Sequence, residues 1–223
     1  YEPGRSMGTF GEDCAAKYGF TRAEQDAFAT ASVERAKAAT ASGAFAAEIT
    51  PVTVKSRAGE TVVSVDEGPG KVKLDKIASL KPAFKKDGTI TAASSSSIND
   101  GAAALVMMRA STATKLGCKP LARIVGHATH AQEPEWFATA PLGATQKALA
   151  KAGWAVGDVD LWEINEAFAV VPMALMKELN LPHDKVNVNG GACALGHPIG
   201  ASGARIMVTL IYALQARGLK KGL

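Results

Sequence analysis

The order of apolar and polar stretches along the chain predicts a succession of helices and strands. Residues 21–43 predict a helix with both ends marked. Thr21 can cap its first turn, and Glu24 can bond back to Thr21 in a capping box. Gly43 can close its last turn, because glycine adopts the left-handed conformation at helix ends.

Three further patterns in the first half predict strands and a short helix. Residues 48–54 and 61–65 predict two strands around a loop that contains Gly59, which is typical of a hairpin. Serines and an Asn-Asp pair lead into residues 102–108, an apolar run that predicts a fully buried strand. A short helix is predicted over residues 110–117.

From Pro120 onward, predicted strands and helices alternate. The strands cover 121–130, 159–164 and 185–189, and the helices cover 141–153, 165–180 and 200–218. Pro172 must kink the second of these helices or lie near its start. The alternation predicts an α/β layered domain in which helices pack on a sheet.

Composition and charge narrow the class of protein. Hydrophobic residues make up 47% of the 223 residues and charged residues 21%, which is typical of a soluble globular protein. The net charge of +4 comes without a basic stripe interleaved with aromatics, so no nucleic acid partner is expected. The longest apolar runs, 102–108 and 167–176, are too short to span a bilayer, so no membrane association is expected.

The three cysteines, Cys14, Cys118 and Cys193, lie far apart and form neither a CxxC pair nor an even set. Neither a zinc site nor a disulfide framework is therefore predicted. A reducing intracellular setting fits best, cytoplasmic in the first instance, with mitochondrial and peroxisomal compartments left open. Cys193 precedes His197 by four residues, as a nucleophile and its base could, but its neighbours in GGACALG favour close packing instead.

His197 is the strongest candidate for chemistry. Gly196 and the glycines before it let the backbone approach a ligand closely, and Pro198 fixes the direction in which the chain leaves. The predicted helix that follows would disfavour a positive charge on the imidazole, and a neutral imidazole can act as a base near neutral pH. The alternative is a tight structural turn that contains a histidine.

Asn165 and Glu166 follow directly on the predicted strand 159–164. Ligands gather at the carboxyl ends of strands in α/β sheets. Asn165 could equally be a helix cap, and Glu166 could interact with the helix dipole. The lysine-rich segment 71–86 is either a solvated face or a landing surface for a ligand that bears phosphate.

Two longer stretches resemble a known family. Residues 165–169, NEAFA, and 187–205, NVNGGACALGHPIGASGAR, resemble motifs in the C-terminal half of thiolases of the acetyl-CoA acetyltransferase type. Residues 7–32 and 94–108 resemble other parts of that family, so the resemblance covers the whole chain. It implies an α/β, thiolase-like layered αβαβα fold, present in part, with an inserted α+β loop domain. The implied domains are 1–94, the CoA-binding loop domain; 95–119, the end of the N-terminal core domain; and 120–223, the truncated C-terminal core domain.

The resemblance also implies what this sequence lacks. In the family, the N-terminal third carries the cysteine that is acylated, and the closing strand carries a second cysteine that acts as acid and base. None of the three cysteines here lies in either motif. The start at Tyr1 and the stop just after the last predicted helix suggest that both ends are cut, and the chain by itself is predicted to be inactive.

Catalytic and binding roles follow from the resemblance residue by residue. His197 matches the histidine that activates the nucleophilic cysteine and helps to hold the thioester oxygen. Asn165 matches the asparagine that positions a water in that oxyanion hole. The residues implied to contact coenzyme A are Phe168, beside the pantetheine tunnel; Ala92, Ser95 and Ser96, on the pantetheine loop; and Lys71 or Lys73, in place of an arginine near the phosphates.

The implied activity is thiolytic cleavage of a 3-ketoacyl-CoA, or the reverse Claisen condensation, with acetoacetyl-CoA as the expected substrate in fatty acid metabolism. Coenzyme A is a substrate, and this chemistry needs no metal or redox cofactor. A homodimer or homotetramer is expected at full length. Two alternatives stay open: a thiolase for longer 3-ketoacyl chains, and a CoA-binding or structural fragment without activity.

Overall fold

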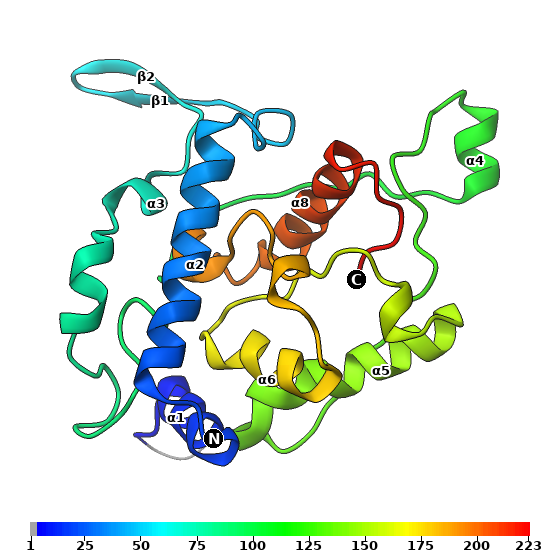
Figure 1. Cartoon of the computed structure of the whole chain (residues 1–223). Helices are drawn as coiled ribbons and strands as arrows, with labels where there is room; N and C mark the ends of the chain where they lie inside the picture. The colour runs from blue at the N-terminus through cyan, green and yellow to red at the C-terminus, as the bar shows by residue number, and fades with distance from the viewer. Residues whose placement is uncertain (1–3) are drawn as a thin grey trace.

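The computed structural model describes residues 4–223, so Tyr1 lies outside the described residues. Helices joined by long extended segments make up most of the molecule (Figure 1). The first part contains α1 (Met7–Tyr18), α2 (Arg22–Ala41), β1 (Val52–Ser56), β2 (Gly59–Val63), α3 (Glu67–Lys71) and the 3-10 helix η1 (Leu74–Ser79). The second part contains α4 (Ala110–Lys115), η2 (Pro134–Thr139), α5 (Ala140–Ala152), η3 (Val156–Asp158), α6 (Val170–Leu179), η4 (His183–Lys185), α7 (Ala192–Leu195) and α8 (Ser202–Ala216).

Helix α2 confirms the predicted helix and both of its end signals. The backbone N–H of Glu24 donates to Oγ1 of Thr21 over 3.2 Å, and the N–H of Thr21 donates to Oε2 of Glu24 over 2.7 Å. Gly43 follows the helix with a φ of 76°. The helix packs against α7 and α3, so it supports the loop that carries His197.

The predicted hairpin is also confirmed. β1 and β2 pair antiparallel, with Val52 opposite Val63, and every residue of both strands is exposed. Figure 1 shows the hairpin standing away from the body of the molecule, beyond the end of α2.

Two of the predicted core strands do not form, and these predictions were wrong for the described chain. Residues 102–108 are extended but not buried, since Val106 is 89% exposed and Met107 68%. Residues 121–130 are likewise extended and form no strand, with Ile124 56% exposed. The reason is that a strand needs a partner, and no segment between residues 4 and 223 pairs with either of them.

The other two predicted strands are reduced to single parallel bridges. Trp162 bridges Val186, and Leu161 bridges Gly222. Trp162 N donates to Lys185 O over 2.9 Å, and Glu163 N donates to Leu223 O over 2.8 Å. Three segments thus run side by side, with residues 161–163 in the middle, and this small parallel sheet delivers Asn165 to the site.

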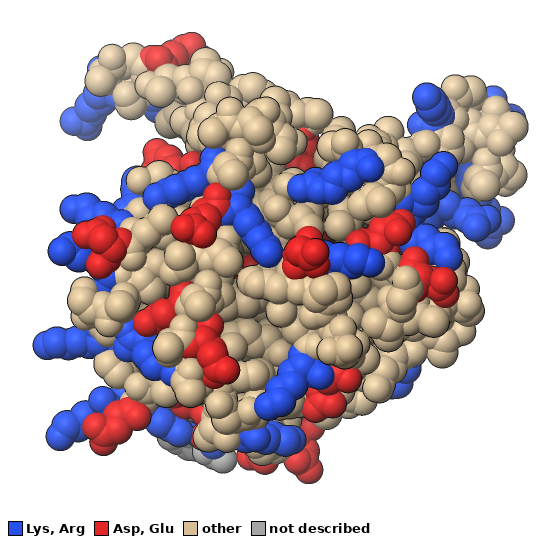
Figure 2. Space-filling model, viewed as in Figure 1, with Lys and Arg blue, Asp and Glu red and all other residues tan. Residues whose placement is uncertain are grey.

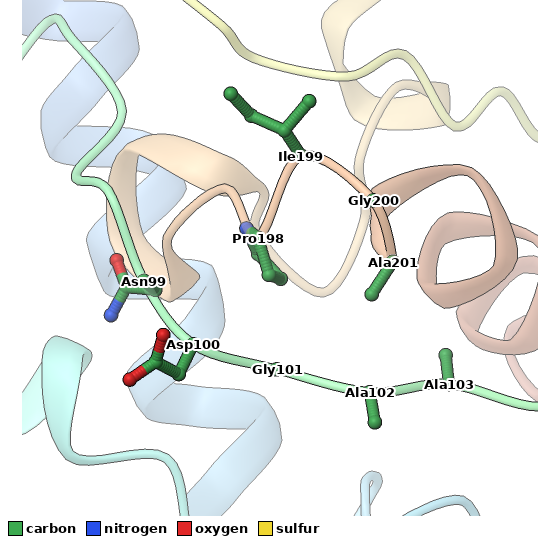
Figure 3. A pocket seen from close by; sticks show the side chains of 9 residues that line it. All are labelled: Asn99, Asp100, Gly101, Ala102, Ala103, Pro198, Ile199, Gly200 and Ala201. Atoms are coloured by element: carbon green, nitrogen blue, oxygen red, sulfur yellow. The ribbon is translucent and has the colours of Figure 1, made fainter.

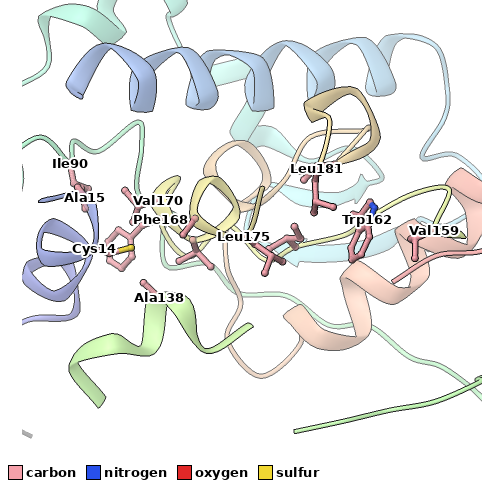
Figure 4. Close-up of a cluster of buried hydrophobic side chains, with 14 of the residues drawn as sticks. Cys14, Ala15, Ile90, Ala138, Val159, Trp162, Phe168, Val170, Leu175 and Leu181 are labelled. Atoms are coloured by element: carbon pink, nitrogen blue, oxygen red, sulfur yellow. The ribbon is translucent and has the colours of Figure 1, made fainter. Parts of the chain in front are cut away.

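The largest core cluster lies around this small sheet and α6 (Figure 4). Trp162 and Val170 are at most 1% exposed, and Leu175 3%. The predicted helices over 141–153 and 200–218 are present as α5 and α8. Helix α6 starts later than predicted, at Val170, and Pro172 lies near its start. No helix in residues 4–223 is long and apolar enough to cross a membrane.

Candidate active site

His197 lies half-buried in the loop between α7 and α8, where one hydrogen bond and a tight glycine turn fix its backbone. The N–H of His197 donates to Ser97 O over 2.9 Å. Gly196 ends α7 with a φ of 89°, and a Cβ at this position would lie 2.2 Å from Oδ1 of Asn99. Glycine suits this position in both conformation and space, and the predicted close approach of a ligand stays a prediction.

Hydrogen bonds indicate which nitrogen of the His197 ring carries the proton. The hydroxyl of Ser202 donates to Pro198 O over 3.0 Å, so its oxygen accepts from Nδ1 of His197 over 2.6 Å. Nδ2 of Asn165 lies 3.3 Å from Nε2 of His197 and donates to it in the assigned amide orientation. The network therefore assigns the proton to Nδ1 and a lone pair to Nε2.

Burial lowers the pKa of His197 below its ordinary value of 6.5, and the positive charge of Arg205 lowers it further. The direction agrees with the expectation of a neutral imidazole, although the main cause is burial. A neutral ring with its lone pair on Nε2 is the form that can accept a proton near neutral pH.

Asn165 follows the central segment of the small sheet, as predicted. The side chain of Asn187 fixes the residue before it: Oδ1 accepts from Ile164 N, and Nδ2 donates to Ile164 O, each over 2.8 Å. The alternative of a helix cap is wrong, because α6 starts at Val170 and its N-cap is Ala169. The amide is instead directed at His197.

The loop predicted to contact pantetheine docks onto the same turn. Ser95 bridges Phe168, and both N and Oγ of Ser96 donate to Ala167 O over 3.1 and 3.0 Å. These bonds bring Ser95 and Ser96 together with Asn165 and His197 in one region. Ala92 is exposed on the approach to this loop.

Phe168 belongs to the core on the other side of this turn. It is 7% exposed and packs edge-on against Phe84 and Phe137, with ring centroids 5.6 and 6.2 Å away. Its predicted place beside a pantetheine tunnel stays a prediction.

Lys71 and Lys73 lie outside the hydrogen-bonded site. Both are exposed, and Lys71 pairs with Glu67 one turn earlier on α3. Figure 2 shows basic side chains along the edge of the molecule where α3 and η1 lie, with acidic side chains among them. α3 nevertheless packs close to the site, because a Cβ on Gly68 would lie 2.7 Å from Ala194 O.

A groove of about 370 Å³ opens at Pro198, the residue after His197 (Figure 3). Two short segments form its walls, one after Ser97 and one after His197: Asn99, Asp100, Gly101, Ala102, Ala103, Pro198, Ile199, Gly200 and Ala201. The segments touch at one point, where a Cβ on Gly101 would lie 2.8 Å from Cγ of Pro198.

The cysteines do not supply a nucleophile beside His197. Burial raises the pKa of the Cys193 thiol, and Glu166 raises it further. Burial raises the pKa of Cys14 to about 11. Cys118 is exposed at the end of α4. In the described residues, the hydrogen bonds of the His197 ring go to Asn165 and Ser202 only, as the close-packing interpretation of Cys193 predicts.

The sequence interpretation missed Ser202 and gave Glu166 a different role. Ser202 holds Nδ1 of His197, and its only signal was a hydroxyl five residues after the histidine in the same motif. Glu166, expected at a helix start, is fully buried and accepts bonds from three segments of the chain. No signal in the sequence marks a carboxylate as buried.

Comparison with known proteins identifies close relatives. The family descriptions "Thiolase, N-terminal domain" and "Thiolase, C-terminal domain" match residues 2–111 and 118–223. The acetyl-CoA acetyltransferase of Chromobacterium violaceum is 54% identical over 97% of this chain and 56% of its own length. A probable acetyl-CoA acetyltransferase of Dictyostelium discoideum is 53% identical over 98% and 53%. The chain thus spans about half the length of the curated relatives it matches.

Solved structures agree with this result. The Bacillus anthracis acetyl-CoA acetyltransferase superposes with a TM-score of 0.95 at 47% identity, over 98% of this chain and 56% of that one. The human mitochondrial 3-ketoacyl-CoA thiolase gives a TM-score of 0.89 at 39% identity, over 97% and 55%.

Proposed function

The chain belongs to the thiolase family and has its α/β fold, and we propose that it supplies the base and the oxyanion partner of an acyltransferase site. The observation that carries the proposal is the bonded series Asn165–His197–Ser202, which leaves a lone pair on Nε2 of a neutral imidazole. The proposed reaction is cleavage of acetoacetyl-CoA by coenzyme A to give two acetyl-CoA, or its reverse.

Thiolysis gives His197 a defined task. Nε2 takes the proton of a cysteine thiol that the family carries in its N-terminal third, since a thiolate attacks far better than a thiol. The thiolate attacks C3 of acetoacetyl-CoA, the C2–C3 bond breaks, and the electron pair leaves on the enolate of acetyl-CoA. The enolate then takes a proton at C2 from the thiol of the family's second cysteine, which acts as the acid. In the second half, the thiolate of that second cysteine takes the proton of coenzyme A, and the coenzyme A thiolate attacks the acetyl-cysteine thioester. The C–S bond to the first cysteine breaks, acetyl-CoA is released, and the freed cysteine takes its proton back from Nε2 of His197.

Negative charge develops on a substrate oxygen in these steps, and it needs donors that are already in place. The protonated Nε2 of His197 is one such donor. The other is a water positioned by Asn165, whose Nδ2 lies 3.3 Å from Nε2 of His197. The same two residues therefore serve as base and as oxyanion hole.

Coenzyme A would approach over the loop of Ser95 and Ser96, with Phe168 and Ala92 beside its path. The docking of this loop onto Ala167 and Phe168, one turn from Asn165, supports that path. Lys71 and Lys73 would meet the phosphates. The domain division at 94 and 119 remains part of this proposal.

The remaining assignments are proposals of the same kind. The acyl group moves as a thioester and no electrons are transferred, so the chemistry requires neither a redox cofactor nor a metal. A cytoplasmic role in fatty acid metabolism and a homodimeric or homotetrameric full-length enzyme complete the proposal. Higher identity to acetyl-CoA acetyltransferases than to the 3-ketoacyl-CoA thiolase favours the short substrate over longer chains.

The test replaces His197 in a full-length thiolase chain that carries residues 1–223. His197→Ala is expected to lower the rate of acetoacetyl-CoA cleavage at least about a hundredfold, which is the scale for loss of a base or an oxyanion donor. Folding should be nearly intact. The control is His127→Ala, because His127 is exposed and takes part in none of the hydrogen bonds of the His197 ring. Near-normal turnover of His197→Ala would refute the assignment.

A further inference from the structure

Glu166 directly follows Asn165 in the chain, and its side chain is fully buried. Carboxylates are seldom buried unless they are paired or fully bonded, because removing a charge from water is costly. A buried carboxylate at this position therefore requires compensating contacts.

Both of its oxygens are used. Oε1 accepts from Nδ2 of Asn187 over 2.7 Å. Oε2 accepts from Oγ of Ser32 over 2.7 Å and from N of Cys193 over 3.0 Å. The oxygen of Ser32 in turn accepts from Gly191 N over 3.0 Å, so its hydroxyl proton is free to donate to Glu166.

Neighbouring atoms also pack closely around the carboxylate. A Cβ on Gly191 would lie 2.2 Å from Cδ of Glu166. The carboxylate therefore has one position, fixed by α2, by the turn that contains Asn187 and by the start of α7.

The groups that bond to Glu166, its three anchors, lie next to both residues of the Asn165–His197 contact. Asn187 also holds Ile164, the residue before Asn165, through its Oδ1 and Nδ2. Cys193 lies in α7, whose last residue, Leu195, is two positions before His197. A shift of the carboxylate would move both ends of the contact relative to each other.

We propose that Glu166 is the positioning residue of this site: it holds the Asn165 turn and the His197 loop at bonding distance. The inference rests on the proposed function, since it assigns a role toward the same reaction. Glu166 touches no reacting atom and acts through Asn187, Ser32 and Cys193.

The test variant is Glu166→Gln in a full-length thiolase chain that carries residues 1–223. Glutamine has the same shape but only one acceptor oxygen, so at least one of the three donors would face an NH2 group. The matched control is Glu163→Gln, three residues earlier and also buried. Burial raises the pKa of Glu163 to about 8, so glutamine reproduces its neutral form at pH 7. The side chain of Glu163 bonds to none of the three anchors.

Two readouts separate positioning from general destabilisation. The first is the ring ¹⁵N signal of His197 Nε2, which reports its contact with Asn165 and requires no turnover. The second is the division of the effect between kcat and KM in acetoacetyl-CoA cleavage. Glu166→Gln is expected to move the Nε2 signal and to lower kcat about tenfold to a hundredfold, as misplaced catalytic groups do, with KM little changed. Glu163→Gln should change neither.

An unchanged Nε2 signal in folded Glu166→Gln would overturn the inference, and so would an equal loss in Glu163→Gln. If Glu166→Gln does not fold, Ser32→Ala removes one anchor only and is expected to move the same signal to a lesser extent. A wild-type chain without turnover would refute the proposed function alone, because the His197 signal would still decide the role of Glu166.

Discussion

Only one nitrogen of the His197 ring is available for proton transfer. Nδ1 is committed to the hydroxyl of Ser202, which itself is anchored on Pro198 O. A histidine whose tautomer is fixed in this way presents its lone pair in one direction, and catalysis gains because no reorganisation is needed at the moment of reaction. Ser202 thus orients the base without touching a substrate.

Ser202→Ala is expected to lower kcat for acetoacetyl-CoA cleavage about tenfold, because the ring then loses the acceptor that fixes its tautomer and orientation. The matched control is Thr40→Ala, which removes a helical hydroxyl that bonds only to a carbonyl four residues earlier. Steady-state kinetics of both variants in the full-length chain check this. Equal kcat values for Ser202→Ala and Thr40→Ala would contradict it.

The sequence could indicate His197 from its glycine-rich setting, whereas the role proposed for Asn165 came only from the resemblance to a family motif. It could not predict Ser202 or Glu166 in the same way. Spacing in a glycine-rich turn does not say where side chains point, and burial of a carboxylate depends on segments as remote as Ser32 in α2. The cap interpretation of Asn165 failed for the same reason: the start of α6 depends on packing.

Besides Glu166, the acidic residue Glu163 is also buried, and it lies in the small parallel sheet. Glu163 lies in its central segment, 8% exposed, and Oε1 has no hydrogen-bond partner. Burial is the main cause of its raised pKa, and the charges of Glu166 and Glu48 add to it, while Arg205 and Arg217 oppose it. The segment therefore tolerates this side chain best as a neutral acid.

This state makes stability depend on pH. The folded pKa is about 8, against an ordinary value of 4.5, so the contribution of Glu163 is fully present below 4.5 and is lost as pH rises through 8. Glu163→Gln should remove this dependence. Free energies of unfolding measured between pH 4.5 and 9 should therefore fall for the wild type relative to the variant. A constant difference between the two proteins would contradict the assignment.

The elements predicted correctly are those whose signals are local. The capping box of α2 and the glycines after α2 and α5 are read from a few adjacent residues. The predicted strands 102–108 and 121–130 failed because a strand is completed by a partner far away in sequence, and the described residues offer none.

At the scale of the whole molecule, these two segments leave apolar side chains and unpaired backbone on the surface. Val106, Met107 and Ile124 are 89%, 68% and 56% exposed. Exposed apolar strands of this kind invite pairing with other chains.

A polypeptide of residues 1–223 is therefore expected to self-associate as its concentration rises. Val106→Lys should weaken the association, because a charge on an open strand opposes pairing. Sedimentation velocity over a range of concentrations checks both proteins, with Lys55→Ala on the distant hairpin as the control. A wild-type polypeptide that stays monomeric throughout the range would contradict the expectation.

The described chain presents a neutral imidazole at His197, ready to accept a proton at Nε2. The most direct measurement is the titration of the His197 ring by NMR in the full-length chain, assigned by comparison with His197→Ala. We expect a midpoint below 6.5, because burial and Arg205 both disfavour the protonated ring, and a higher midpoint in Arg205→Met. A wild-type midpoint at or above 6.5 would contradict it.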